Sequence, residues 1–390
     1  MPAAEAFALF GNNAVFFILG AFIISAVLVE CGLSTRLTVL VLERGAFSPR
    51  SLRTSILLFG AFASFWMSEH AVAAMMYPIV LALVGALGLK PGSRFGMSFF
   101  FAMAWGCVIG GIATYLGGAR NPLAMGILYA DTGVRIPFLS WMIASLPLVA
   151  LLLASALILL RVMFAEEPVD LDAARRSLRE EHQNLGAVKG QEIGVAVITV
   201  LTIIAWIALH DFIGLAIIAL VAVALLFIFR LTQWEEVQRN VNWGIILMYG
   251  GAIALGSALS TTGAAAWFVD VTLERMPLSS FALVCLLGAL SLLLTEFISN
   301  AAVVSVIMPV AIGLARSHGI PFEIMTFAVA LPSGLSYVLP MGTPATAIAY
   351  GSKFMTQKDF MRVGPLMALI SLTLFALVAK LWWPMIGYRF

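Results

Sequence analysis

The chain has 390 residues, of which 62% are apolar and only 11% are charged, and its formal net charge is +2. Its mean hydropathy is +1.04, whereas a soluble domain carries about 25% charged residues. This composition excludes a secreted domain, a cytosolic enzyme and a nucleic-acid-binding protein, and it predicts a chain embedded in the lipid bilayer. The three cysteines lie in apolar stretches, so we expect no disulfide, no metal cluster and no organic cofactor.

Several apolar segments have the length of a membrane-spanning helix, which needs about 20 residues to cross a hydrocarbon core of about 30 Å. In chain order they are 14–33, 95–116, 137–160, 191–209, 212–229, 242–262, 325–340 and 363–383. The first run has no basic segment before it, so it predicts a span rather than a cleaved signal peptide. The charged stretch 165–190 predicts a short amphipathic helix in an aqueous linker. The sequence therefore predicts an all-α polytopic membrane protein.

Two further apolar stretches, Thr54–Leu89 and Leu278–Ala315, are each interrupted near the middle by polar residues. The arm Thr54–Met67 would form only about 21 Å of helix, which is too short for a perpendicular crossing. We predict two re-entrant helical hairpins whose tips end inside the protein. The alternative is a pair of short tilted helices with a polar tip at the far surface.

The chain also repeats its own pattern. At one constant offset the matching segments are Gly20-Ala21 and Gly251-Ala252, Leu42-Glu43-Arg44 and Leu273-Glu274-Arg275, and Ser68 and Ser299. A second set of matches occurs at nearly the same offset: Gly117, Ala124 and Gly126 pair with Gly342, Ala349 and Gly351. An odd number of spans separates equivalent points, so the second copy is inverted, as in many secondary transporters. We predict a first repeat at 1–164, a linker at 165–190 and a second, inverted repeat at 191–390.

The distribution of basic residues predicts the orientation. With the base of the first hairpin inside, most of the 22 lysines and arginines fall on the cytoplasmic side, including those of the 165–190 linker. Basic residues around short apolar stretches predict helices lying on the membrane surface at Arg36–Arg53 and Trp267–Arg275. The second repeat is preceded by two spans that the first repeat lacks, so we expect an N-terminally short chain.

Polar or glycine-containing interruptions occur at four places at membrane depth. They are Ser68-Glu69-His70, Ser299-Asn300-Ala301, Gly117-Gly118-Ala119-Arg120-Asn121-Pro122 and Met341-Gly342-Thr343-Pro344-Ala345-Thr346. Irregular backbone is tolerated at this depth only where it is buried in protein or lines a cavity. Helix N-termini at such breaks suit an anion, and freed carbonyls suit Na⁺. The four interruptions together predict a transport site.

The phrases SFWMSEHAVAAMMYPI and TEFISNAAVVSVIMPVA resemble the paired Ser-Asn-Thr hairpin signatures of the divalent anion:sodium symporter family, within the ion transporter superfamily. The stretches IGGIATYLGGARNPLAMGIL and LPMGTPATAIAYGS are similar to the paired helix breaks of that family. The resemblance extends from about Ala8 to the C-terminus. It implies a homodimer with a scaffold domain and a moving transport domain in each protomer, an elevator mechanism, and Na⁺-driven transport of a small dianion such as a dicarboxylate.

The resemblance implies a set of ligand residues. The substrate and ion contacts are Ser68, Glu69, His70, Gly118, Arg120, Asn121, Ser299, Asn300, Ala301, Gly342, Thr343, Pro344 and Thr346. Those expected near Na⁺ are Ser68, Asn121, Ser299, Asn300 and Thr343. The first hairpin motif is atypical, because Glu69 stands at the Asn position and His70 at the Thr position. Arg120 replaces a proline of the first break, and Ala301 replaces the Thr of the second tip.

A buried carboxylate at Glu69 would repel a dianion and needs a partner. Three interpretations are open. Glu69 forms an ion pair with Arg120 or His70; Glu69 and His70 couple transport to H⁺ instead of Na⁺; or Glu69 binds a cation directly. Arg120 can also hold a carboxylate of the substrate. Glu296, just before the second tip, is expected to be a buried hydrogen-bonded carboxyl.

The sequence thus predicts a secondary active transporter, not an enzyme, in the plasma membrane of a bacterium. We expect its partners to be a small anionic substrate, the lipid bilayer and a second copy of the chain, and we expect no nucleic-acid partner. Alternatives are a proton-coupled carrier, an efflux or exchange carrier of the same superfamily, or a membrane scaffold that does not transport.

Overall fold

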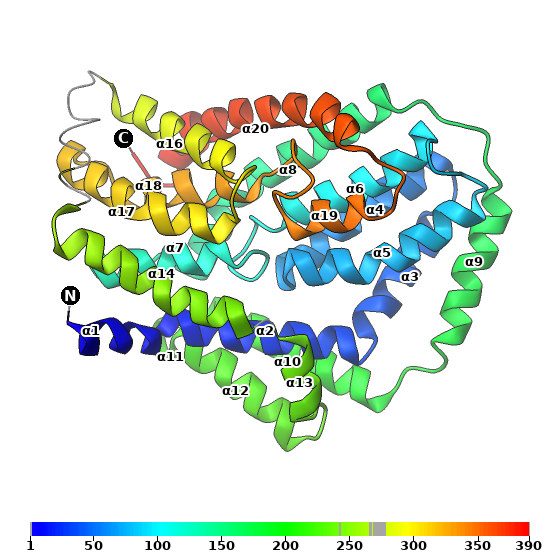
Figure 1. The fold of residues 1–390 in the computed structure, drawn as a ribbon. Helices are drawn as coiled ribbons and strands as arrows, with labels where there is room; N and C mark the ends of the chain where they lie inside the picture. The colour runs from blue at the N-terminus through cyan, green and yellow to red at the C-terminus, as the bar shows by residue number, and fades with distance from the viewer. Residues whose placement is uncertain (1, 242, 265–266, 268–277, 390) are drawn as a thin grey trace.

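The structure of the protein, a computed structural model, describes residues 2–241, 243–264, 267 and 278–389. The regular secondary structure of these residues is helical (Figure 1). The elements of the first half are α1 (Ala3–Ala8), η1 (Leu9–Gly11), α2 (Asn13–Glu30), α3 (Leu33–Gly45), α4 (Pro49–Trp66), α5 (Glu69–Ala86), α6 (Arg94–Gly110), α7 (Arg120–Thr132), α8 (Phe138–Met163) and α9 (Leu171–Asn184). Those of the second half are α10 (Gly190–Ala208), α11 (His210–Ile213), α12 (Leu215–Ile228), α13 (Trp234–Asn240), α14 (Trp243–Thr261), α16 (Ser280–Leu294), α17 (Asn300–His318), α18 (Phe322–Ala330), η2 (Pro332–Gly334), α19 (Pro344–Tyr350) and α20 (Gln357–Met385).

Long apolar helices confirm the predicted membrane protein. Helices long and apolar enough to cross a bilayer comprise α2 with the short elements before it, α5, α8, α10, α17 and α20. Shorter apolar helices include α6, α12 and α16. The linker 165–190 contains the amphipathic helix α9, which buries Ala174 and Leu178 and exposes most of its charged side chains.

The first predicted hairpin is present as α4 and α5, joined by only Met67 and Ser68. It begins earlier than Thr54, because Ser48 caps α4 by accepting a hydrogen bond from the Ser51 amide (3.1 Å) and is followed by proline. The predicted surface helix Arg36–Arg53 is therefore wrong in extent: it is split between α3 and the first arm of the hairpin. The predicted helix is interrupted because a new helix, α4, starts at Pro49 directly after the turn at 46–48.

The second predicted hairpin is present as α16 and α17, joined by residues 295–299. Serine caps both arms: Ser279 accepts from the Ala282 amide and Ser299 from the Ala302 amide, each at 3.3 Å. The predicted surface helix at Trp267–Arg275 falls, apart from its first residue, outside the described residues.

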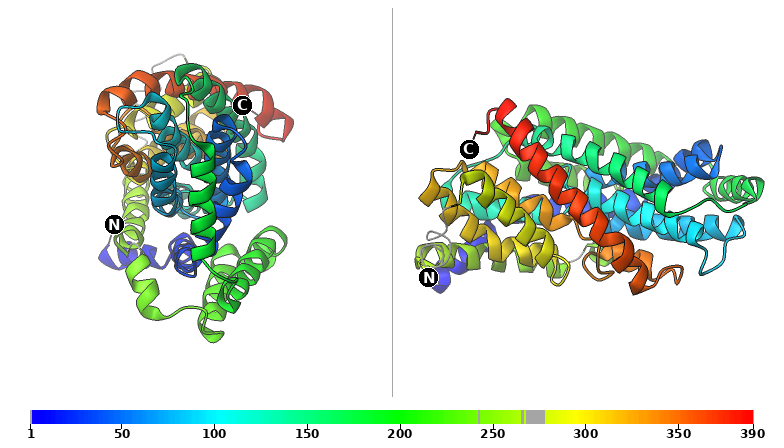
Figure 2. Two further views of the ribbon diagram at one scale, coloured as in Figure 1. Left: turned by 90° about the vertical axis from the view of Figure 1, so that its right-hand side faces the viewer. Right: turned by 90° about the horizontal axis from the view of Figure 1, so that it is seen from above.

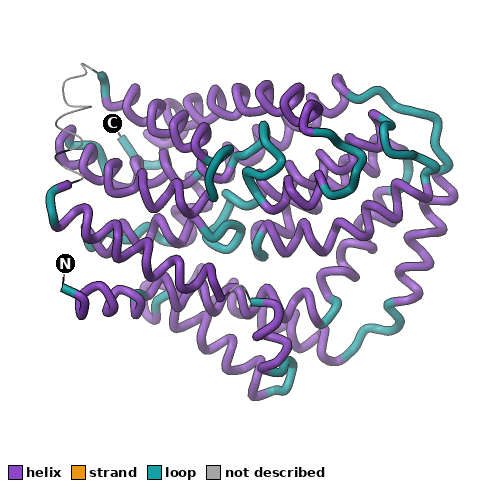
Figure 3. The backbone as a smooth tube through the Cα atoms, viewed as in Figure 1, coloured by secondary structure: helices purple, strands orange, loops and turns teal. Residues whose placement is uncertain are grey.

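Both predicted helix breaks are present, but they begin earlier than expected. Helix α6 ends at Gly110 and α7 starts at Arg120, while α18 ends at Ala330 and α19 starts at Pro344. The predicted span 325–340 is thus too long, because Pro332 cannot continue a helix. Figure 3 shows these two non-helical segments in the interior of the molecule rather than at its ends.

Glycines let the first hairpin lie directly on the broken helix α6. A Cβ on Gly106 would come within 2.4 Å of the Leu57 carbonyl oxygen, and one on Gly110 within 2.2 Å of the Ala61 carbonyl oxygen. Small residues at this spacing allow two helix backbones to approach closely. The hairpin and the first break therefore form one tightly packed unit.

Two parts can be distinguished in Figures 1 and 2. One contains α2, α10 and α12, which pack on one another; the other contains the hairpins, the broken helices, α8 and α20. Helix α14 contacts α7 and α17 of the larger part. Helix α9 lies along one end of the molecule, between the end of α8 and the start of α10, and packs on α3 and α5.

A buried arginine joins the linker to α3. Arg36 donates to both carboxylate oxygens of Glu192, at 2.6 and 3.1 Å, and to the carbonyl oxygens of Leu185 and Gly186, at 3.2 and 3.0 Å. The Arg36 and Glu192 side chains are 8% and 3% exposed. Because hydrogen bonds to charged groups contribute about 1.5–3 kcal/mol each, this cluster fixes the end of the linker.

Replacing Arg36 with alanine is expected to release this segment. We expect trypsin to cleave after the exposed Lys189 about tenfold faster or more, since cleavage of a locally open segment follows the population of its open form. Arg179, whose ion pair with Glu43 is 67% and 29% exposed, provides the control. Equal cleavage rates in the wild type, Arg36→Ala and Arg179→Ala would contradict the prediction.

Candidate site between the hairpin tips

Three helix N-termini meet at the centre of the molecule. Glu69 begins α5, Arg120 begins α7 and Asn300 begins α17. The Glu69 Oε1 and Arg120 Nη1 atoms are 3.0 Å apart, and the two side chains are 0% and 1% exposed. With its amide oriented to satisfy both ends, Asn300 accepts from Arg120 Nη1 (3.2 Å) and donates to Thr295 Oγ1 (2.8 Å) and to the Gly342 carbonyl (3.2 Å). The structure thus brings together both hairpin tips and the first break.

Two glycines form the walls around the Arg120 guanidinium. A Cβ on Gly118 would come within 2.4 Å of Arg120 Nη1, and a Cβ on Gly334 would come within 2.0 Å of Nη2. Gly118 was predicted as a site residue, whereas Gly334 was missed. The sequence carries no signal for Gly334, because its role depends on the second break folding against the first.

The first break is held by the side chain of Asn121. Asn121 Nδ2 donates to the carbonyl oxygens of Gly111 (2.9 Å) and Thr114 (2.7 Å). The tip of the hairpin is tied to the same break, since the Glu69 amide donates to the Gly117 carbonyl (2.9 Å). Among the described residues, the buried Asn121 Oδ1 has no hydrogen-bond partner. It is therefore an available oxygen ligand.

Ser68 and His70 flank Glu69 and are both partly exposed. Ser68 caps α5 without a side-chain hydrogen bond to the helix. The His70 side chain is 29% exposed, and its Nδ1 lies 3.8 Å from Glu69 Oε1, farther than the Arg120 nitrogen. The ion pair with Arg120 confirms one of the three interpretations of Glu69. Proton coupling and direct cation binding stay predictions.

The second tip is more open than the first. Ser299 is exposed, Asn300 is half-buried and Ala301 is buried. The flanking side chains Phe297 and Met341 are 68% and 69% exposed. The second tip is therefore exposed on the surface of the chain, whereas the Glu69 and Arg120 side chains of the first tip are enclosed.

The second break is held by Glu296, as expected for a buried hydrogen-bonded carboxyl. Its Oε1 accepts from the amides of Tyr337 (2.7 Å) and Val338 (3.0 Å), and its Oε2 from the Leu339 amide (2.8 Å) and Ser336 Oγ (3.0 Å). One carboxylate thus satisfies three backbone donors of the irregular segment. Each break is thus held by one polar side chain. Asn121 donates to backbone carbonyls of the first break, and Glu296 accepts from backbone amides of the second.

Thr343 and Thr346 form a capping box at the start of α19. The Thr343 amide donates to Thr346 Oγ1 (3.2 Å), and the Thr346 amide donates to Thr343 Oγ1 (3.3 Å). Both threonines are buried, whereas Pro344, the first residue of α19, is exposed. Gly342 is buried, and a Cβ there would come within 1.8 Å of Ser336 Oγ. All four predicted residues therefore lie at the second break.

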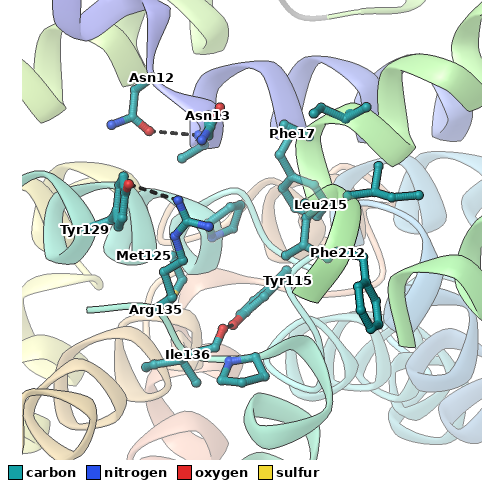
Figure 4. A pocket seen from close by; sticks show the side chains of 18 residues that line it. Asn12, Asn13, Phe17, Tyr115, Met125, Tyr129, Arg135, Ile136, Phe212 and Leu215 are labelled. Atoms are coloured by element: carbon teal, nitrogen blue, oxygen red, sulfur yellow. Dashed lines mark hydrogen bonds between the residues drawn. The ribbon is translucent and has the colours of Figure 1, made fainter. Parts of the chain in front are cut away.

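A cavity of about 350 Å³ lies beside the first break, between α2, α7 and the α11–α12 region (Figure 4). Arg135 at this cavity donates to Tyr129 Oη (2.9 Å) and lies over the Tyr129 ring (4.4 Å). The cavity also touches Tyr115 of the break and Pro122 of α7. Sequence patterns gave no signal for this cavity, because its walls come from segments far apart in the chain.

Paired hairpins, paired broken helices and a polar centre surrounded by apolar helices define a membrane transporter of the secondary class. The chain belongs to the family described as "Sodium:sulfate symporter transmembrane region", whose sequence model matches residues 3–388.

Relatives with described activities agree with this assignment. The sodium-dependent dicarboxylate transporter SdcS of Staphylococcus saprophyticus is 27% identical over 402 residues, covering 96% of this chain and 77% of that protein. SdcS of Staphylococcus aureus strain USA300 is 27% identical over 396 residues, covering 95% and 76%. The crystal structure of the Alcanivorax borkumensis YdaH transporter, described as having an unusual topology, is similar in fold with a TM-score of 0.63 at 16% identity, covering 99% of this chain and 88% of that one.

Proposed function

We propose that the protein couples Na⁺ to the transport of a small dianion, such as a dicarboxylate, by elevator-type alternating access. The observation that carries the proposal is the meeting of the N-termini of α5, α7 and α17 at one buried polar centre, since N-termini favour anions. Relatives at 27% identity are sodium-dependent dicarboxylate transporters. The proposed cargo approaches the second tip, where Ser299 is exposed.

We assign the substrate contacts mainly to the second tip and the second break. Ser299 and Asn300 present a hydroxyl and an amide at the start of α17. Thr343 and Thr346 lie at the start of α19, directly after Gly342, whose carbonyl accepts a hydrogen bond from Asn300. The proposed Na⁺ ligands are oxygen atoms, which this ion prefers, from Ser68, Asn121, Ser299, Asn300 and Thr343. The buried Asn121 Oδ1, which has no partner among the described residues, supports this assignment.

We also propose the organisation of the whole carrier. The first repeat is 1–164, the linker is 165–190 and the inverted second repeat is 191–390. Each half contains one hairpin and one broken helix, which supports the duplication. The carrier acts as a homodimer in the plasma membrane, with the linker on the cytoplasmic side, where its basic residues favour it.

Thermal unfolding of the purified protein tests the proposal. Na⁺ and a dicarboxylate together are expected to stabilise it, by about 2.7 kcal/mol when the ligand is at 100 times its Kd. The anions to compare are succinate, citrate and sulfate, each with Na⁺ or choline. Ser299→Ala is expected to weaken the stabilisation. Ser317→Ala, at the other end of α17, is the matched control.

The proximity of His70 to Glu69 favours one second candidate, a proton-coupled carrier. It predicts stabilisation that depends on pH, ignores Na⁺ and is lost in Glu69→Gln. No stabilisation by any of these anions, at any pH, would leave a scaffold as the better description and would contradict the proposed function. Counterflow in vesicles then separates uptake from efflux or exchange.

A further inference from the structure

The two halves of the chain differ at matching positions in the centre of the site. Where the first tip has Glu69, the second tip has the uncharged Asn300, at the offset that pairs Ser68 with Ser299. Where α7 begins with Arg120, the offset that pairs Gly117 with Gly342 gives Ala345. The first half thus carries two opposite charges that the second half lacks, and they form an ion pair of 3.0 Å.

The Arg120 guanidinium is enclosed rather than open to a solute. Its side chain is 1% exposed, and the two glycine walls leave no room for a methyl group beside Nη1 or Nη2. Among the described residues, Nε and Nη2 have no hydrogen-bond partner, although they are buried. A guanidinium that binds an exchangeable anion needs an open face for it. The enclosure by Gly118 and Gly334, and not the two unpartnered nitrogens, therefore argues against a direct contact between Arg120 and the cargo.

The same guanidinium joins the two tips. Its Nη1 is bonded to Glu69 Oε1 at the start of α5 and to the Asn300 amide oxygen at the start of α17, at 3.0 and 3.2 Å. Oxygen atoms from both tips thus share one positive charge. A free Na⁺ between two such tips would bind to oxygen ligands in the same way.

We propose that Arg120 is a resident cation, a covalently attached positive charge that holds the two hairpin tips together in place of an exchangeable Na⁺. The inference rests on the proposed function and goes further, because it concerns how many Na⁺ ions that site needs. Glu69 neutralises the guanidinium, so the pair adds no net charge, and the positive end of α17, at the exposed second tip, stays available to the cargo. Closure of the tips then requires one Na⁺ fewer than it would without Arg120.

The experiment removes the resident cation and asks whether a free one replaces it. Thermal unfolding of Arg120→Gly is measured with millimolar guanidinium, Na⁺ or choline. The variant is expected to melt at a lower temperature in choline and to recover part of the loss with guanidinium, which fits the vacated space beside Glu69. Arg50→Gly is the matched control, because the Arg50–Glu166 pair is exposed (68% and 33%). It should show no recovery.

The Na⁺ requirement is measured with the double variant Glu69→Asn/Arg120→Gly, which removes both charges. We expect the Hill coefficient for Na⁺ stabilisation in the presence of a dicarboxylate to rise by about one relative to the wild type. Arg120→Lys, which keeps a cation at this position, should retain the wild-type coefficient and serves if the double variant does not fold.

Two results would overturn the inference. The first is that guanidinium restores Arg120→Gly no better than choline does. The second is that the Hill coefficient for Na⁺ does not rise in the double variant. A higher Hill coefficient in Arg120→Lys than in the wild type would contradict the inference equally. Failure of the proposed function looks different: no anion stabilises the wild type in Na⁺, while the guanidinium experiment still reports on the resident cation.

Discussion

Replacing Glu69 with alanine is expected to lower the free energy of unfolding by about 3–5 kcal/mol, because it leaves the Arg120 guanidinium buried without its counter-charge. Arg120→Ala should lower the free energy of unfolding by a similar amount, because it leaves the Glu69 carboxylate buried without its counter-charge. The Glu69→Ala/Arg120→Ala variant is expected to lose less than the sum of the two single changes, since no isolated charge is left. Thermal or denaturant unfolding in detergent measures all three.

The exposed pair of Arg50 and Glu166 is the control for this cycle. Its side chains are 68% and 33% exposed, so Arg50→Ala should change the free energy of unfolding by at most about 1 kcal/mol. If the Glu69 and Arg120 effects simply added, the two side chains would act independently, and the description of a coupled buried pair would be wrong.

Replacing Glu296 with alanine is expected to be equally damaging, and to act mainly on the cargo site. The change removes the acceptor of three backbone amides and one hydroxyl in the second break, and donors left unsatisfied cost about 1–3 kcal/mol each. The segment between η2 and α19 would then no longer hold Thr343 in place. We expect the Glu296→Ala protein to melt at a lower temperature and to be no longer stabilised by an added anion.

Glu296→Gln provides the graded comparison, because an amide offers one acceptor oxygen instead of two. It should retain part of the stability and little anion binding. The exposed Glu235 is the matched control, and Glu235→Gln should leave both unchanged. Normal anion stabilisation in Glu296→Ala would show that the second break does not depend on this carboxylate.

The sequence by itself determined the membrane class, the two hairpins and the two broken helices. These depend on local signals: the length of an apolar run, the polar residues that interrupt it, and the serine and proline residues that begin helices. The polar interruptions Ser68-Glu69-His70 and Ser299-Asn300, together with the offset that pairs Ser68 with Ser299, were enough to locate both tips. The starts of α4 and of the two breaks were misplaced by several residues, because caps and turns compete with the apolar pattern.

The sequence also gave a list of polar residues for the site, and the structure places them at the two tips and breaks. It left open what Glu69 pairs with, since Arg120 is distant in the chain and His70 is adjacent. Only the tertiary structure decided this: the Arg120 nitrogen lies 3.0 Å from Glu69 Oε1 and the His70 nitrogen 3.8 Å. Backbone direction at a helix start, rather than closeness in sequence, sets which side chains meet.

The tertiary structure alone also revealed the parts that neighbours in space create. Gly334 encloses Arg120, the predicted buried carboxyl of Glu296 finds its partners in the second break, and Arg36 holds the end of the linker. Each depends on segments far apart in the chain folding against one another, so no local pattern can signal the contact. Buried charges and irregular backbone need partners in the absence of water, and long-range packing decides which partners these are.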